Sequence, residues 1–121
     1  MAHRERRMFM ILATVRMVMP PEKFSEAVSV LLRTVERTRV ETGCDRSDLY
    51  QDAREAHAIL LEEAWKSDEE LDHHLRSDSF RDVLLVMEMA LEPPEMQFST
   101  VARVEGIERA RAARSLTHSF L

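Results

Sequence analysis

The residues best suited to chemistry gather around the only tryptophan, Trp65. Hydrophobic and polar residues alternate before Ser67, which predicts a strand with Glu63 and Trp65 on the same face. After Ser67 the spacing becomes helical, and Ser67 with Glu70 forms a capping box typical of a helix start. His74 falls on the apolar side of that helix. We therefore expect an indole, a carboxylate and an imidazole along one pocket wall.

His74 is the candidate catalytic residue, since an imidazole titrates near working pH and can act as a general base. The alternative is a half-buried helix histidine satisfied by a neighbour. Trp65 is a candidate for binding a flat substrate ring, or else it fills the core or a dimer interface. Glu63, a further candidate in the substrate site, needs a partner because an unpaired buried carboxylate is costly. It either forms a structural ion pair with Arg16 or Arg103, or it tunes His74.

The acidic and histidine side chains of the same predicted helix do not have the spacing of a metal site. Only two of the pairs, Glu69 with His73 and Glu70 with His74, share a helix face. The chain contains no His-x3-His pair of the kind that binds zinc. We therefore predict no metal.

Composition excludes several classes of protein. The 121 residues carry 17 basic and 22 acidic side chains, a net charge of −5, so no basic field is available for nucleic acid. One cysteine rules out an internal disulfide framework and fits a reducing compartment. No apolar run approaches the roughly 20 residues that a membrane span needs. We expect a single domain in the cytoplasm that binds neither nucleic acid nor membrane.

The rest of the hydrophobic pattern predicts four strands and two helices. The strands are expected at 8–19, 46–52, 56–65 and 96–104, with one helix after Pro20-Pro21. The other helix begins near Ser67 and breaks at 77–79, and its second piece is expected to bury Phe80, Val83, Leu84, Met87 and Leu91. The order β-α-β-β-α-β is the split-βαβ arrangement. It predicts an α+β, ferredoxin-like fold with an antiparallel sheet.

Two helices cover only one face of such a sheet, and we expect the other face to be apolar. That open face would show Trp65, one alternating set of residues 8–19 and part of 96–104. An apolar area of this size usually marks an interface. We therefore predict a homodimer that packs the open faces together and encloses a cavity in each half. Residues 105–121 form a tail with a short helix, which either clasps the partner subunit or frays.

The same residues carry a family resemblance. Glu63-x-Trp65-x-Ser67, followed by Leu71, His74, Ser77 and Phe80, resembles the signature of the antibiotic-biosynthesis monooxygenase (ABM) domain. Upstream, Glu41-Thr42-Gly43-Cys44, followed by Tyr50, resembles the Glu-Pro-Gly-Cys turn of that family and the strand after it. The resemblance covers roughly residues 8 to 104. We assign an ABM-like domain to 1–104, with 1–7 as a loose N-terminus, and a tail to 105–121. The resemblance implies a dimeric α/β barrel built from two ferredoxin-like sheets.

That family includes cofactor-independent monooxygenases, whose substrates supply the electrons that reduce O2. The resemblance therefore implies a small aromatic, phenolic or quinol substrate, bound in an apolar cavity without a cofactor. His74 would be the base, Tyr50 a substrate-binding hydrogen-bond partner and Trp65 an apolar wall. The Tyr50 hydroxyl has an equally simple alternative, which is to reach water.

Two other functions compete with this one. The haem-degrading branch of the fold uses an asparagine on the first strand together with Trp and His. This chain has no asparagine, and Ala13, Thr14 and Arg16 occupy that region, which counts against haem. The alternative from a different class is a non-catalytic, dimeric small-molecule-binding or structural module that keeps the fold without turnover.

Overall fold

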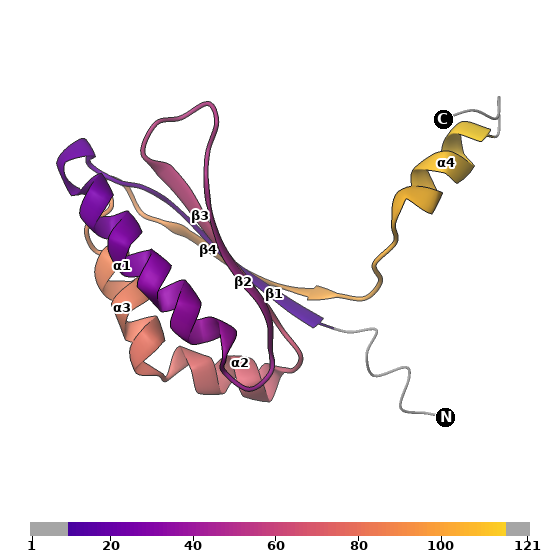
Figure 1. The fold of residues 1–121 in the computed structure, drawn as a ribbon, viewed down its shortest axis with the longest axis horizontal. Coiled ribbons are helices and arrows are strands. Elements are labelled where there is room, and N and C mark those ends of the chain that lie inside the picture. The colour runs from indigo at the N-terminus through magenta and orange to yellow at the C-terminus, as the bar shows by residue number, and fades with distance from the viewer. Residues whose placement is uncertain (1–9, 116–121) are drawn as a thin grey trace.

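The computed structural model describes residues 10–115, which form a four-stranded antiparallel sheet with helices packed on one face (Figure 1). Three predicted features lie outside the described residues: the strand start at Met8 and Phe9, the N-terminus at 1–7 and the tail end at 116–121. The elements are β1 (Met10–Val18), α1 (Pro21–Arg39), β2 (Cys44–Gln51), β3 (Ala58–Trp65), α2 (Asp68–Leu75), α3 (Asp78–Met87), β4 (Glu95–Val101) and α4 (Ile107–Ser115).

The strands lie in the order β2-β3-β1-β4, and every neighbouring pair is antiparallel. Register places Ile11 of β1 opposite Trp65 of β3 and Ala13 opposite Glu63. This topology is the α+β, ferredoxin-like arrangement that the hydrophobic pattern predicts. Strands β1 and β2 are consecutive in the chain, on either side of α1, but they are not neighbours in the sheet, because β3 lies between them.

The core fills the space between the sheet and the helices α1 and α3. Alternate residues of β1, including Val15 and Met17, point to this face and are almost completely buried. Leu31 and Val35 of α1 and Val83 of α3 meet them there. Residues at this spacing lie on one side of a helix, so each helix contributes one apolar stripe.

Helix ends follow the local signals in the chain. Pro21 occupies the first turn of α1, where its missing N–H costs nothing. The Ser67 hydroxyl accepts a hydrogen bond from the Glu70 amide at the start of α2, which confirms the predicted helix start at Ser67. The Glu70 carboxylate accepts from the Ser67 hydroxyl rather than from its backbone amide. Ser77 caps α3 in the same way through the amide of Phe80. The predicted break between the two helical pieces is therefore confirmed.

Several predicted boundaries and burial assignments are wrong. Strand β3 starts at Ala58 rather than at 56, because His57 takes a left-handed backbone conformation with φ of 68° that interrupts the extended chain. Strand β4 ends at Val101 rather than at 104. Leu84 and Leu91, expected in the core, are 43% and 62% exposed. Leu84 lies outside the buried stripe formed by Val83 and Val86, and Leu91 follows the end of α3.

The position of Trp65 corrects a further prediction. It was expected on the open face of the sheet, yet it lies on the helix face, fully buried against α2. The open face instead carries Met10, Leu12, Thr14 and Arg16, all partly exposed. The alternation of β1 is apolar on both sides and so gives no indication of which side the helices cover. Helix α4, the short helix predicted in the tail, has no buried residue and projects away from the sheet (Figure 1).

Candidate functional site

The candidate site lies on the helix face, where the end of β3 meets α2. Strand alternation directs Glu63 and Trp65 toward α2, and the helical spacing of Leu71 and His74 directs both side chains back toward them. Trp65 and His74 are both 0% exposed. Their ring centroids are 4.6 Å apart with planes tilted by 31°, and the Phe80 ring meets His74 edge-on at 5.8 Å. The predicted meeting of indole, carboxylate and imidazole is present.

Both ring nitrogens of His74 face carboxylates. Nδ1 lies 2.9 Å from Oε1 of Glu41, in the turn after α1, and Nε2 lies 3.3 Å from Oε1 of Glu63. The Trp65 indole N–H donates to the same Glu63 oxygen at 3.1 Å. Glu63 therefore has neither of its two predicted arginine partners, because Arg16 pairs with Asp52 and Glu55, and Arg103 lies near Glu105. Its partner is His74, which was the other alternative.

These neighbours set the charge of the imidazole. Burial alone would lower the pKa of His74, because it disfavours the charged ring. The hydrogen bonds and negative charges of Glu63 and Glu41 together outweigh this and raise the pKa above its ordinary value. In its protonated form His74 links two carboxylates and compensates for the burial of Glu63.

Glu41 is the member of this cluster that the sequence pattern does not predict. The chain around it was noted only as a turn resembling that of the ABM family. In this turn the Cys44 amide donates to the Glu41 carbonyl at 3.1 Å, and Gly43 has a φ of 88°, a left-handed conformation that favours glycine. A Cβ at Gly43 would overlap the side chain of Glu70. The missing side chain therefore allows α2 to approach the turn and brings His74 to Glu41.

A small apolar cavity adjoins Glu63 between the sheet and the helices. Its walls come from all of these elements: Ala13, Val15, Leu61, Glu63, Leu75, Phe80, Met96 and Phe98. The free space is about 10 Å³, which is room for about one water molecule. Oε2 of Glu63 is buried and makes no hydrogen bond among the described residues. It is the polar atom best placed to meet a molecule in this cavity, whereas His74 is not part of the lining.

A larger pocket lies on the other side of His74 and opens to solvent. It has a volume of about 510 Å³ and is lined by Val40, Glu41, Thr42, Glu69, Glu70, His73 and Ser77. The Glu41 side chain is 26% exposed there, whereas the His74 side chain behind it is 0% exposed. His73 points toward this solvent side, as its place on the helix predicts.

Tyr50 is not brought to this site. It pairs with Leu60 of β3, on the open face of the sheet, and is 47% exposed. It lines a separate hollow of about 210 Å³ together with Arg16 and Asp52. Trp65, Glu63 and His74 share the helix face, so a molecule bound against them is separated from Tyr50 by the sheet.

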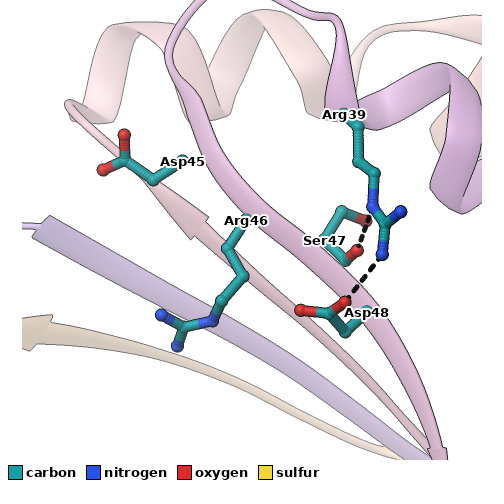
Figure 2. A pocket seen from close by; sticks show the side chains of 5 residues that line it. All are labelled: Arg39, Asp45, Arg46, Ser47 and Asp48. Atoms are coloured by element: carbon teal, nitrogen blue, oxygen red, sulfur yellow. Dashed lines mark hydrogen bonds and ion pairs between the residues drawn. The ribbon is translucent and has the colours of Figure 1, made fainter.

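A further hollow follows the edge strand β2 (Figure 2). Arg39 crosses it and donates to the Ser47 carbonyl at 2.9 Å and to the Asp48 carboxylate at 2.8 Å. Arg46, on the opposite face of the strand, lies 3.5 Å from Glu62. These charges are mutually paired at a partly exposed edge, which indicates a solvated ion-pair network rather than a site.

The site does not fit haem or a reactive thiol. Nδ1 of His74 is hydrogen-bonded to Glu41, Nε2 lies 3.3 Å from Glu63 without a hydrogen bond among the described residues, and the adjoining cavity has space for about one water. Burial raises the pKa of the Cys44 thiol to about 11, which keeps it protonated and unreactive. Within residues 10–115 no group of three or more His, Cys, Asp or Glu side chains is arranged to hold a metal ion. No helix in that range has the length and apolar character to cross a membrane.

Several solved structures share this fold. A conserved protein from Methanosarcina mazei Go1 superimposes with a TM-score of 0.70 at 26% identity, covering 82% of this chain and 97% of its own. An antibiotic biosynthesis monooxygenase gives 0.68 at 22% identity, covering 74% and 95%. Rv0793 from Mycobacterium tuberculosis gives 0.67 at 24% identity, covering 80% and 97%.

Comparison of sequences leads to the same family. The uncharacterised protein sll1783 of Synechocystis sp. is 26% identical over 86 residues, a match that covers 70% of this chain. The matched region spans only 58% of the length of sll1783. The model of the antibiotic biosynthesis monooxygenase family matches residues 8–84, more than half of the chain and the whole of the Glu41–Glu63–His74 cluster. The chain belongs to the antibiotic biosynthesis monooxygenase family.

Proposed function

We propose that the protein is a cofactor-independent monooxygenase that oxidises a small phenolic or quinol-like aromatic in the cavity beside Glu63. The observation that carries this proposal is the Glu63 carboxylate, which lines an apolar cavity while Trp65 and His74 hold it from behind. Family membership supports a monooxygenase or a small-molecule-binding module. The substrate class is our inference from the chemistry of the cavity.

The chemistry needs a base in a dry, apolar place. A phenol plus O2 gives a quinone plus water, so the ring supplies all the electrons and no external reductant is required. Removing the phenolic proton makes the ring electron-rich enough to react with O2. Oε2 of Glu63 would accept that proton, and protonated His74 would stabilise the Glu63 carboxylate before the transfer. In this assignment His74 acts through Glu63 and does not touch the substrate itself.

An aromatic ring is larger than the free space of about 10 Å³, so binding requires the cavity to widen. Leu75 and Phe80 lie at the junction of α2 and α3, and Phe98 on β4 is 46% exposed. Leu75 and Phe80 are only partly buried, in contrast to Val15 on the opposite wall, which is 4% exposed. Displacement of Leu75 and Phe80 would admit a ring next to Glu63.

We also propose that two copies form a homodimer through the open face of the sheet. Met10, Leu12 and Leu60 lie on that face and are only partly covered within one chain. With Trp65 turned to the helix face, this interface is less apolar than the sequence predicts. Each substrate cavity would then lie within a subunit rather than between the two sheets.

Turnover of a panel of phenols and naphthols under 18O2 tests the function. A monooxygenase places one labelled oxygen in the quinone product and the other in water. Glu63→Gln should lower kcat by about 10²–10⁴-fold, the usual contribution of a positioned base. The matched control is Glu62→Gln, one residue away on the opposite face and paired with Arg46, which should leave kcat unchanged.

The small volume of the cavity favours a second candidate, a binding module without turnover. The single tryptophan separates the two, because its fluorescence reports directly on the site. Naphthol binding that quenches Trp65 without forming a labelled quinone would favour the binding module. Neither quenching nor turnover across the panel would overturn both functions.

A further inference from the structure

His74 stands between two carboxylates that face different environments. The Glu63 side chain is 6% exposed and lines the small apolar cavity, and the Glu41 side chain is 26% exposed and lines the large solvent-open pocket. The imidazole is 0% exposed and lies 3.3 Å from one and 2.9 Å from the other. The three groups therefore form one line of contacts from the dry cavity to water.

We infer that Glu41 is the solvent end of a proton path, Glu63–His74–Glu41, which exchanges protons between the buried cavity and the pocket at the α1–β2 turn. Only the expected effect of Glu41 on kcat rests on the proposed function. The path itself is a property of the folded protein. Glu41 is a positioning and relay residue, since it touches His74 and not the cavity.

The proton balance along the path closes without any other reactant. Glu63 takes the hydroxyl proton of the substrate, and the Nδ1 proton of the charged ring moves to Glu41, which releases it to water. The Nε2 proton stays on the ring and faces the protonated Glu63. When water forms, Glu63 gives its proton to the product and Glu41 returns a proton to Nδ1, which restores the protonated ring between two carboxylates. Because a phenol plus O2 gives a quinone plus water, the overall reaction releases no proton. The path therefore carries a proton outward on deprotonation and inward again when water forms.

The groups that surround the His74 ring leave Glu63 and Glu41 as its direct proton-transfer partners. Glu63 of β3 and Glu41 of the turn are its two polar contacts. Trp65 and Phe80 cover the ring faces, and neither can accept a proton. Glu70, which shares the outer pocket, is hydrogen-bonded to Ser67.

Exchange of the His74 ring protons with water tests the path without any substrate. In 15N-labelled wild-type protein the ring N–H signals should exchange through Glu41. Glu41→Gln keeps a side chain of the same shape but cannot carry a proton, so ring exchange should slow by about tenfold or more. The matched control is Glu69→Gln, which removes a carboxylate from the same pocket without touching His74 and should exchange at the wild-type rate.

Chemical rescue supplies the kinetic test. Glu41→Ala opens space beside His74 in a pocket that small acids can enter, so added formate should restore ring exchange in proportion to its concentration. If the naphthol panel is turned over, kcat of Glu41→Ala should fall and recover with formate while KM stays constant. Glu41→Asp retains a carboxylate and should keep part of the exchange, which covers the case in which Glu41→Ala does not fold.

The outcomes separate the two proposals. Slowed exchange in Glu41→Gln with no turnover by any variant supports the path and counts against the monooxygenase. Turnover by the wild type with unchanged ring exchange in Glu41→Gln overturns the path and leaves the monooxygenase standing. Slowed exchange that formate does not restore in Glu41→Ala overturns the relay role as well, because it assigns Glu41 a purely structural one.

Discussion

Two adjacent glutamates of β3 illustrate how the faces of the sheet differ. Glu62 points to the open face, where Arg46 lies 3.5 Å away and both side chains contact solvent. Glu63 points to the helix face, where the Trp65 indole and the His74 ring hold one of its oxygens in the core. A surface pair of the first kind contributes little to stability. The second kind is costly to break, because removing one partner leaves a buried charge.

The cost of burying charged groups separates the helix-face cluster from an ordinary structural pair. Replacing a buried ion pair by well-packed apolar residues is often neutral or stabilising, so stability alone does not explain why Glu63 and His74 are charged residues. A carboxylate beside an apolar cavity, with an imidazole behind it, is what deprotonation of a bound ring requires. The open face has no comparable arrangement, since Arg16 and its two carboxylate partners lie at a solvent-exposed end of the sheet.

The largest contrast between the faces is expected at their aromatic residues. Trp65→Ala removes a fully buried side chain and should lower the free energy of unfolding by about 3–5 kcal/mol. Tyr50→Ala, at a position that is 47% exposed, should change it by no more than about 0.5 kcal/mol. Urea denaturation followed by circular dichroism measures both. Equal losses would show that Tyr50 is buried in an assembly and that the open face is not free.

The two neighbouring histidines give the next contrast. His74→Ala leaves Glu63 buried without its partner and should cost about 3 kcal/mol. His73→Ala, on the solvent side of α2, should fall within about 0.5 kcal/mol of the wild type. On an active substrate His74→Ala should also lose turnover beyond its loss of folded protein. A His74→Ala enzyme with unchanged kcat would end the proposal that this ring supports the base.

A smaller effect is expected at the turn that brings Glu41 to His74. Gly43→Ala places a Cβ in a left-handed conformation, at about 1–2 kcal/mol, and pushes it against Glu70. Gly106→Ala, the matched change at the other glycine, lies in an exposed segment and should cost less than about 0.5 kcal/mol. Thermal melts compare the two variants. A neutral Gly43→Ala would show that the approach of α2 to the turn has room to spare.

Much of the fold was predictable because its signals are local. The change of period at Ser67, the capping residues of α2 and α3, and the Pro20-Pro21 pair each mark a boundary within a few residues of the chain. The same local rules place Glu63 and Trp65 on one face and bring His74 back toward them. The fold class and the proximity of Glu63, Trp65 and His74 were therefore predicted correctly.

The errors arise where the answer depends on tertiary contacts. Both alternating sets of β1 are apolar, so the pattern does not tell which one the helices cover, and Trp65 was assigned to the wrong face. Tyr50 was grouped with His74 although the sheet separates them. Glu41 lies in a turn without periodicity and meets His74 across 33 residues of chain. No local signal marks such a contact.

The smallest expected effect is a fall in stability with rising pH near neutrality, which we assign to the buried cluster. Burial lowers the pKa of His74, but Glu63 and Glu41 more than restore it, so the folded protein binds this proton more tightly than the unfolded chain does. The resulting stabilisation is complete below the ordinary histidine pKa of about 6.5 and is lost as pH rises through the raised pKa. Asp52 on the open face has the opposite sign. The amides of Arg54 and Glu55, with Arg16, lower its pKa, so its contribution is lost only in acid.

Urea denaturation at intervals from pH 6 to pH 8, below the range in which the Cys44 thiol titrates, separates the two faces. The wild type should lose stability with rising pH by at most about 1.4 kcal/mol per pH unit, the limit for one proton. His74→Gln should abolish this slope, whereas His73→Gln should retain it. A wild type whose stability stays constant or rises over this range would contradict the raised pKa of His74, because the two carboxylates would then not hold a proton on the ring more tightly than the unfolded chain does.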